Sequence, residues 1–189
     1  MLGMNVSIFS GGAIVLLNRF SPEAAMEVIQ RHHVTVAQTV VPMNVAIMNH
    51  PDARKYDFRS LRMNSCTSFG IQLTEEISDR WKGLTGVGLF ESAYGLSETH
   101  TADTMMDPDA IKFGTTGKPM KGTEIKILSL KEPRQECSVG EEGEIIVRGP
   151  GVFRGYLNKP KATAQTLSDG WVYTGDIGKV DEEGYLYFH

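Results

Sequence analysis

The run Tyr94-Gly95-Leu96-Ser97-Glu98 gathers side chains that together can serve one nucleotide. An aromatic ring offers a face to a base, and a glycine lets the backbone approach a ligand closely. The Ser97 hydroxyl can donate to a phosphate oxygen, and the Glu98 carboxylate is a hard oxygen ligand suited to Mg²⁺. Taken alone, the run is equally well explained as a turn in which Ser97 and Glu98 only cap the next segment.

A second run, Trp171-Val172-Tyr173-Thr174-Gly175-Asp176, places a carboxylate after a glycine at the end of an aromatic strand. An ionised aspartate has two acceptor oxygens and can accept hydrogen bonds from both vicinal hydroxyls of a ribose. As a lone pattern this run fits a hairpin corner equally well.

The elements that must position the first run alternate short apolar strands with amphipathic helices, which is typical of a mostly parallel sheet with flanking helices. Ser21 and Thr74 are the expected N-caps of two of the helices. Loops at the carboxyl ends of parallel strands are where open α/β sheets bind ligands, and Tyr94 follows such a strand. The predicted strands are 13–17, 34–41, 61–67 and 87–91, and the helices follow Ser21, Pro42 and Thr74.

The opening residues 1–18 carry no charge. A signal peptide needs a basic start, and a membrane span needs about 20 apolar residues without polar interruptions, so both are rejected. A buried helix followed by the buried strand 13–17 is expected instead. Such an apolar start also suggests a chain cut from a longer one.

After about residue 108 the helical periodicity disappears, and short strands alternate with Gly, Pro and Asp turns, as in antiparallel β structure. Two domains are therefore expected: an α/β subdomain at 1–107 that carries the first run, and a small β-barrel-like subdomain at 108–189 that carries the second. The predicted β strands are 124–129, 143–148, 171–173 and the hairpin 179–188.

Composition excludes some partners. The net charge of −4 comes from 19 basic and 23 acidic residues, and no segment gathers enough basic side chains to follow a nucleic acid backbone. Cys66 and Cys137 lack metal or redox spacing, so a strand residue and a loop thiol in a reducing cytoplasm are expected. The pair His32-His33 is expected at a helix end, where it complements the helix dipole.

Four motifs occur in one order: Tyr-Gly-Leu-Ser-Glu at 94–98, Gly-Glu-Ile-Ile-Val-Arg-Gly-Pro at 143–150, Gly-Tyr at 155–156 and the run at 171–176. This set resembles the adenylate-forming superfamily, which includes acyl-CoA synthetases, luciferases and peptide-synthetase adenylation domains. The resemblance spans nearly the whole chain and implies an internal fragment of the large domain. Within the superfamily, the chain is most similar to fatty-acyl or medium-chain CoA ligases.

The resemblance implies a role for each matching residue. Tyr94 stacks on adenine, with Gly95 and Leu96 in the same nucleotide-binding loop. Ser97 meets the phosphate and Glu98 holds Mg²⁺, so these two are the expected catalytic residues. Asp176 binds the ribose. The implied reaction joins a carboxylic acid to AMP from ATP and then transfers the acyl group to CoA, without a protein nucleophile.

The loop Ser68-Phe69-Gly70-Ile71-Gln72 departs from the family's usual Gly-Gly-Ala-Pro-Leu type stretch. Ser68, Gly70, Ile71 and Gln72 are still expected to contact the nucleotide, because Gly70 permits close approach. Phe69 and Gln72 change the adenine contacts or the wall of the acyl pocket. Gln72 either hydrogen-bonds the base or merely leads into the next helix.

The run Gly114-Thr115-Thr116-Gly117-Lys118-Pro119 imitates a phosphate loop but follows the first run instead of preceding it. It is therefore expected to be a turn that opens the β region.

The resemblance implies ATP, Mg²⁺ and CoA as cofactor and substrates, a small carboxylic acid as the other partner, and missing N-terminal and C-terminal parts of the same polypeptide. The alternatives are an adenylate-binding module without turnover and an interaction domain with a dead site. Without the missing parts, the isolated chain is expected to bind adenine nucleotides weakly and to show no ligase turnover.

Overall fold

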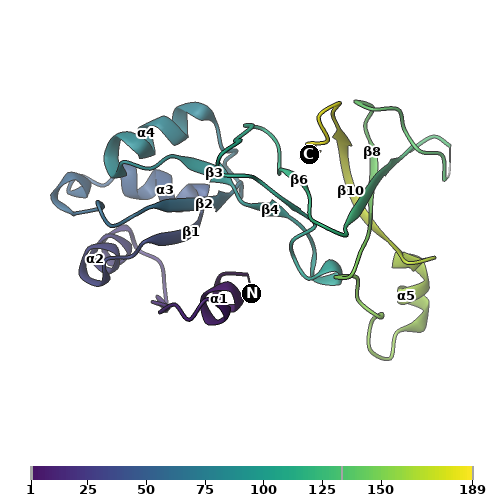
Figure 1. Cartoon of the computed structure of the whole chain (residues 1–189), viewed down its shortest axis with the longest axis horizontal. Helices are drawn as coiled ribbons and strands as arrows, with labels where there is room; N and C mark the ends of the chain where they lie inside the picture. The colour runs from purple at the N-terminus through teal and green to yellow at the C-terminus, as the bar shows by residue number, and fades with distance from the viewer. Residues whose placement is uncertain (1, 133, 189) are drawn as a thin grey trace. The chain divides into compact units, whose positions relative to one another are not determined.

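The computed structural model describes residues 2–132 and 134–188, and the chain forms two compact units that divide between Ser92 and Ala93 (Figure 1). This division comes earlier in the chain than the expected change at residue 107. The run Tyr94–Glu98 consequently belongs to the second unit.

The first unit contains a three-stranded sheet in the order β1-β2-β3, and both strand pairs are parallel. Polar side chains inside it are paired with one another, since the Asn44 amide donates to Asn64 Oδ1 at 3.1 Å and Thr39 donates to Asn44 at 2.7 Å. The prediction of a parallel sheet with helices is confirmed. The strands are β1 (Val36–Val40), β2 (Met63–Thr67) and β3 (Leu89–Glu91).

The helices of this unit begin where the caps predicted them. Ser21 Oγ accepts a hydrogen bond from the Ala24 amide at 3.1 Å, and Thr74 Oγ1 accepts one from the Ile77 amide at 3.3 Å, which satisfies amides that have no partner within the helix. The helices are α2 (Pro22–His32), α3 (Val41–Met48) and α4 (Glu75–Thr85), with the short 3₁₀ helix η1 (Ala53–Lys55) between α3 and α4.

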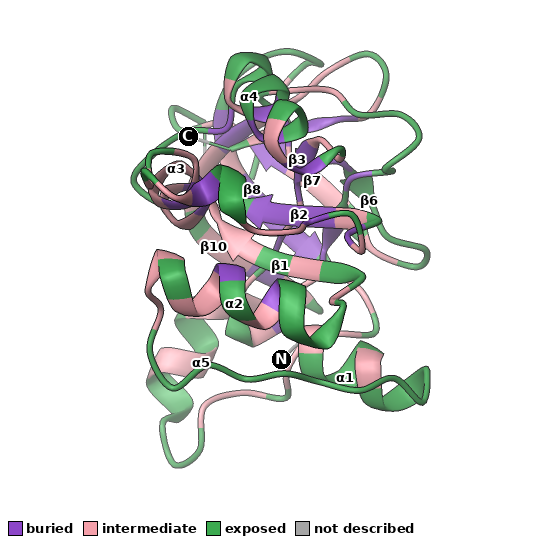
Figure 2. Cartoon of the chain, turned by 90° about the vertical axis from the view of Figure 1, so that its left-hand side faces the viewer, coloured by how far each residue is buried: buried purple, intermediate pink, exposed green. Residues whose placement is uncertain are grey.

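The opening of the chain differs from its prediction. Helix α1 (Leu2–Phe9) forms, although Met1 lies outside the described residues, but Ile8 and Phe9 are 65% and 95% exposed. The predicted strand 13–17 is wrong: these residues form no strand, and Leu16 is 73% exposed. Figure 2 shows the segment between α1 and α2 coloured mostly as exposed. A strand needs a neighbour to satisfy its backbone groups, and the described sheet pairs only β1, β2 and β3. Within the described residues, no helix is long and apolar enough to cross a bilayer.

The second unit is built on an antiparallel sheet in the order β11-β10-β8-β7, which confirms the predicted β-rich architecture. Its core consists of one aromatic and four aliphatic side chains: Tyr94, Ile127, Ile145, Val147 and Leu186. The strands are β7 (Glu124–Leu128), β8 (Gly143–Arg148), β9 (Leu167–Ser168), which pairs with β10, β10 (Trp171–Val180) and β11 (Leu186–Phe188).

Strand β10 carries an irregularity at the predicted ribose residue. Tyr173 pairs with Ile146, but the next paired residue, Ile177, lies opposite Glu144. Three residues of β10, 174–176, therefore lie opposite Ile145 alone, which defines a β-bulge. Asp176 belongs to this bulge and not to the regular ladder.

A second, small antiparallel sheet joins β4 (Ala93–Tyr94), β5 (Thr104–Met105) and β6 (Lys118–Pro119), and the 3₁₀ helix η2 (Ser97–Thr99) lies between β4 and β5. Helix α5 (Pro160–Thr166) precedes β9. The run Gly114–Pro119 begins in a turn and ends in strand β6, in line with its predicted place at the opening of the β region. The Thr116 amide donates to the Leu186 carbonyl at 2.9 Å, so this amide bonds within the protein.

The expected positions of the two cysteines and of the histidine pair are confirmed. Cys66 is buried in β2, and Cys137 is a free thiol outside the strands. Helix α2 ends at His32, and His33 forms its left-handed cap at φ 49°.

Candidate functional site

The loop between β4 and β5 carries the predicted nucleotide motif and is held at both ends. The Tyr94 amide donates to Thr104 Oγ1 at 3.2 Å, and the Asp103 amide donates to the Tyr94 carbonyl at 2.8 Å. A Cβ at Gly95 would lie 2.5 Å from the Thr101 carbonyl carbon, so the close approach predicted for Gly95 is made by the chain's own backbone. Thr101 has φ 76°, a strained conformation for a β-branched residue.

A buried pair, Thr99 and Asp103, fixes the interior of this loop. Thr99 Oγ1 accepts a hydrogen bond from the Leu96 amide at 3.1 Å and donates to the Asp103 carboxylate. Both side chains are 3% exposed. Burial raises the pKa of Asp103 to about 6, and the hydrogen bond from Thr99 opposes that rise.

The 3₁₀ helix η2 presents Ser97 and Glu98 side by side in the sequence. Ser97 is exposed, and Glu98 is half-buried. The Tyr156 hydroxyl donates to Glu98 Oε1 at 2.6 Å, and the Phe153 amide donates to the Glu98 carbonyl at 2.7 Å. The hydrogen bond to Glu98 raises the pKa of Tyr156. One carboxylate oxygen of Glu98 is thus held by a phenol.

Tyr94 and Asp176 are brought together across the second unit. The Tyr94 hydroxyl donates to Asp176 Oδ2 at 2.8 Å. Tyr94 is only 6% exposed, and the centroid of its ring lies 5.4 Å from that of Phe188, so little of its surface is open to a base. Burial raises the pKa of Tyr94, so its hydroxyl remains a donor near neutral pH. The Asp176 amide donates to Thr174 Oγ1 at 3.0 Å, which fixes the bulge.

The remaining predicted residues, Ser68 to Gln72, follow β2 in the first unit. The Ser68 hydroxyl donates to Glu91 Oε2 at 2.6 Å, and its amide also donates to the Glu91 carboxylate at 3.1 Å. Ser68 Oγ accepts from the Leu73 amide at 2.9 Å, which closes the loop. Burial raises the pKa of Glu91, which is 8% exposed.

The middle of this loop is open. Gly70 has φ 74°, a left-handed conformation that favours glycine. Phe69 is 73% exposed, Ile71 is 38% exposed, and Gln72 is exposed. The loop therefore presents two apolar side chains and one amide outward from a firmly anchored base.

Sequence reasoning missed the groups that hold the predicted residues. Glu91, Asp103 and Tyr156 each contact a motif residue or its neighbour, yet only Tyr156 stood in a recognised motif. A carboxylate at the end of the buried segment Leu-Phe-Glu is a usable signal for Glu91, because buried charges need partners. Nothing in the local sequence marks Asp103.

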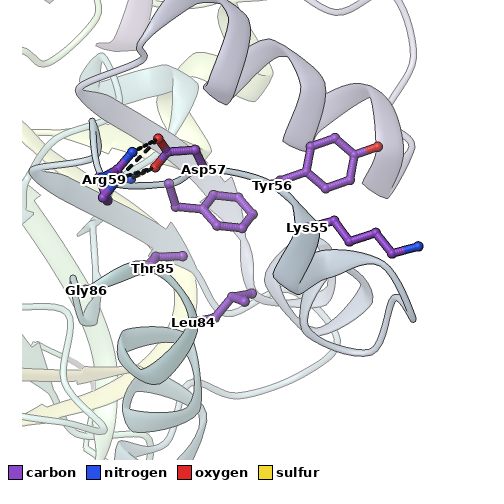
Figure 3. Close-up of a pocket in the computed structure, with 8 residues that line it drawn as sticks. Lys55, Tyr56, Asp57, Arg59, Leu84, Thr85 and Gly86 are labelled. Atoms are coloured by element: carbon purple, nitrogen blue, oxygen red, sulfur yellow. Dashed lines mark hydrogen bonds and ion pairs between the residues drawn. The ribbon is translucent and has the colours of Figure 1, made fainter.

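The first unit also contains an open hollow of about 490 Å³ (Figure 3). Its lining includes Lys55, Arg59 and Gly86 but none of the predicted site residues. Both cations are already paired, Lys55 with Asp52 at 2.6 Å and Arg59 with Asp57 at 2.7 Å. The hollow therefore offers no uncompensated charge to a nucleotide.

The donor set of the second unit fits Mg²⁺ held together with phosphates. The part of the chain that the structure describes contains no group of three or more His, Cys, Asp or Glu side chains placed to hold a metal alone. Mg²⁺ usually binds through one or two carboxylates plus substrate phosphates. Glu98, half-buried with one oxygen engaged by Tyr156, meets that requirement. Asp176, with Oδ2 engaged by Tyr94, similarly retains an acceptor oxygen for a sugar hydroxyl.

The family described as "AMP-binding enzyme" matches residues 1–157. The chain is 38% identical over 188 residues to a long-chain-fatty-acid–CoA ligase of Bacillus subtilis (strain 168), covering 97% of this chain and 32% of that protein. It is 32% identical over 187 residues to 4-coumarate–CoA ligase 3 of Arabidopsis thaliana, covering 96% of this chain and 33% of that protein.

Among solved structures, the O-succinylbenzoate coenzyme A synthetase of Bacillus subtilis, in complex with ATP and magnesium ion, matches with a TM-score of 0.82 and 30% identity. The match covers 98% of this chain and 38% of that one. The chain thus spans about a third of the length of the curated relatives it matches.

Proposed function

Because the chain belongs to the family of AMP-binding enzymes, we propose that it forms part of an AMP-forming acid–thiol ligase, an acyl-CoA synthetase. The observation that carries the proposal is the half-buried Glu98 carboxylate, which has one oxygen bonded to Tyr156 and lies next to the exposed Ser97 hydroxyl. A metal ligand and a phosphate donor in adjacent positions suit the activation of a carboxylic acid by ATP.

In the proposed reaction, an oxygen of the substrate carboxylate bonds to the α-phosphorus of ATP. The bond from that phosphorus to the oxygen that bridges the α- and β-phosphates breaks, and pyrophosphate leaves with this oxygen. The sulfur of the CoA thiolate then bonds to the acyl carbon, the bond from that carbon to the oxygen shared with the phosphate breaks, and AMP leaves with that oxygen. Mg²⁺, when bound, neutralises charge that develops on the phosphate oxygens. The chain's own residues bind and align the reactants.

Each motif residue has a proposed role. Ser97 donates to the phosphate, Glu98 provides the metal ligand, and Asp176 accepts hydrogen bonds from the ribose hydroxyls. Tyr94 borders the adenine and, through its hydroxyl, orients Asp176; the 2.8 Å hydrogen bond supports the second part of this role. Gly95 and Leu96 complete that loop.

The loop Ser68 to Gln72 is proposed to contact the nucleotide, with Ser68, Gly70, Ile71 and Gln72 as the contacting residues. Its attachment to the buried Glu91 supports a fixed position for these contacts. A loop that is already fixed in position loses less conformational freedom when a ligand binds.

We propose a fatty acid as the activated substrate and the cytoplasm as the compartment. The 38% identity to a long-chain-fatty-acid–CoA ligase and the exposed apolar side chains of Phe69 and Ile71 support the substrate class. The relatives also include a 4-coumarate–CoA ligase, so aromatic acids are the competing class. The two free cysteines support the compartment.

The test is a chimera in which this chain replaces the matching third of the Bacillus subtilis long-chain ligase. Pyrophosphate exchange with ATP, followed by CoA-dependent AMP release, should occur with fatty acids and should fall strongly in the Glu98→Gln chimera. Exchange that is unchanged by Glu98→Gln would contradict the proposal. Saturable ATP binding without exchange, in a chimera as stable as the parent ligase, would favour a nucleotide-binding module without turnover.

A further inference from the structure

We propose that Tyr156 is a positioning residue for Glu98: its hydroxyl holds one carboxylate oxygen so that the other faces the metal. This inference rests on the proposed function, because it assigns a partner to the metal ligand of that site. Tyr156 itself touches neither the metal nor the substrate in this scheme.

The first support is the hydrogen bond between the two side chains. At 2.6 Å, the contact from the Tyr156 hydroxyl to Glu98 Oε1 has the length of a charge-assisted O–H to carboxylate bond. The two residues lie 58 positions apart in the sequence, so the bond is a tertiary contact and not a local turn. Within the described part of the chain, this is the one side-chain hydrogen bond to the Glu98 carboxylate.

The second support is that Tyr156 is itself fixed. Its amide donates to Thr163 Oγ1 of α5 at 2.9 Å, and its ring packs edge-on against Phe153 with the centroids 4.9 Å apart. At Gly155, φ is +135°, and a Cβ there would lie 2.7 Å from Thr163 Cγ2. Helix α5, which buries none of its own residues, thus fixes the backbone of Gly155 and Tyr156 through Thr163.

The third support is that residues 151–156, the segment that carries Tyr156, also contact the backbone of η2. The Phe153 amide donates to the Glu98 carbonyl at 2.7 Å. A Cβ at Gly151 would lie 2.5 Å from the Thr99 carbonyl oxygen, so only glycine permits this approach. Main chain and side chain of Glu98 are therefore positioned by one continuous segment, residues 151–156. A metal ligand bound in this way loses little freedom when the metal arrives.

The test begins with the chain alone, in a double-mutant cycle of Tyr156→Phe and Glu98→Ala. Phenylalanine keeps the ring contact with Phe153 and removes only the hydroxyl. Tyr156→Phe should lower the folding equilibrium constant about fivefold in the wild-type background, and should leave it unchanged when Glu98 is alanine. Equal effects in both backgrounds would overturn the proposal, because the hydrogen bond would then be absent.

The second measurement is the affinity of the chimera for Mn²⁺, used in place of Mg²⁺. Electron paramagnetic resonance monitors the binding of Mn²⁺ in the presence of ATP. Tyr156→Phe should weaken Mn²⁺ binding about tenfold, which is the usual effect of losing a partner of a metal ligand. Tyr187→Phe is the matched control, because its hydroxyl donates to Asp181 at 3.2 Å in a pair outside the motif, and it should leave Mn²⁺ affinity unchanged.

The possible results separate the two proposals. If Glu98→Ala weakens Mn²⁺ binding and Tyr156→Phe does not, the positioning role is wrong and the proposed function stands. If Glu98→Ala also leaves Mn²⁺ binding unchanged, the metal site of the proposed function fails and the positioning role fails with it.

Discussion

Replacing Asp103 by asparagine should remove a distinct part of the pH dependence of folding. Asp103 is 3% exposed, and burial raises its pKa from an ordinary 3.8 to about 6. The folded protein therefore keeps the Asp103 proton at pH values where the unfolded chain has already released it. The stability that this proton supplies is fully present below the unfolded pKa, and it is lost as the pH rises through about 6.

The size of the effect follows from the shift. A difference of about two pKa units corresponds to about 3 kcal/mol in the free energy of unfolding. Relative to Asp103→Asn, the wild-type chain should lose about that much between about pH 4 and about pH 8. Other carboxylates, such as Asp181 with its pKa lowered to about 2, are present in both proteins and cancel in the difference.

The assay is urea unfolding at a series of pH values. The fluorescence of Trp171 reports the unfolding, because Trp171 lies in the same unit as Asp103. Thr99→Val provides a second check. It removes the hydrogen bond that opposes the rise, so the midpoint of the pH dependence should move to a higher pH. A stability difference between wild type and Asp103→Asn that stays constant across the pH range would refute the reasoning.

Three further substitutions test the site. In the chimera, Glu98→Gln should slow pyrophosphate exchange by an amount equivalent to about 2 to 4 kcal/mol while changing ATP binding little, because charge develops mainly in the transition state; wild-type exchange would exclude the metal role. Asp176→Ala should mainly raise the KM for ATP, and 2′-deoxy and 3′-deoxy ATP should no longer be penalised relative to ATP. If both analogues stay impaired, the ribose assignment is wrong. In the chain alone, Ser68→Ala should lower the free energy of unfolding of the first unit by about 1 to 3 kcal/mol, since it leaves the buried Glu91 carboxylate with fewer donors. Trp81 fluorescence during urea unfolding measures this change, and an unchanged midpoint would show that the hydrogen bond between Ser68 and Glu91 does not stabilise the unit.

Much of the fold was predictable because its signals are local. Ser21 and Thr74 marked helix starts, since a capping oxygen satisfies amides within the next turn. The segment 13–17 was mispredicted because an apolar run indicates burial only where something covers it, and the described sheet provides no neighbour. Helix α5 was missed because it buries no residue and so has no apolar face.

The sequence motifs predict roles for Tyr94, Glu98 and Asp176, and those roles stay predictions. The sequence does not specify the contacts among these residues or the direction in which the Tyr94 ring points. The structure places most of Tyr94 in the core and directs its hydroxyl to Asp176, a partner 82 positions away in the sequence. Contacts over such separations depend on strand register, which local pattern does not encode.

The bulge in β10 makes Asp176 separable from the sheet that carries it. Three residues, 174–176, lie opposite one in β8, so β10 holds two surplus residues, and an even surplus keeps Val172 and Gly178 directed to the same face. Excising Gly175 and Asp176 together would leave Thr174 opposite Ile145 in a continuous ladder, whereas excising either one alone would leave the one-residue surplus of an ordinary bulge. The carboxylate proposed to bind the ribose is therefore carried by residues that the pairing on either side does not require, so it can be changed without altering the register of the sheet.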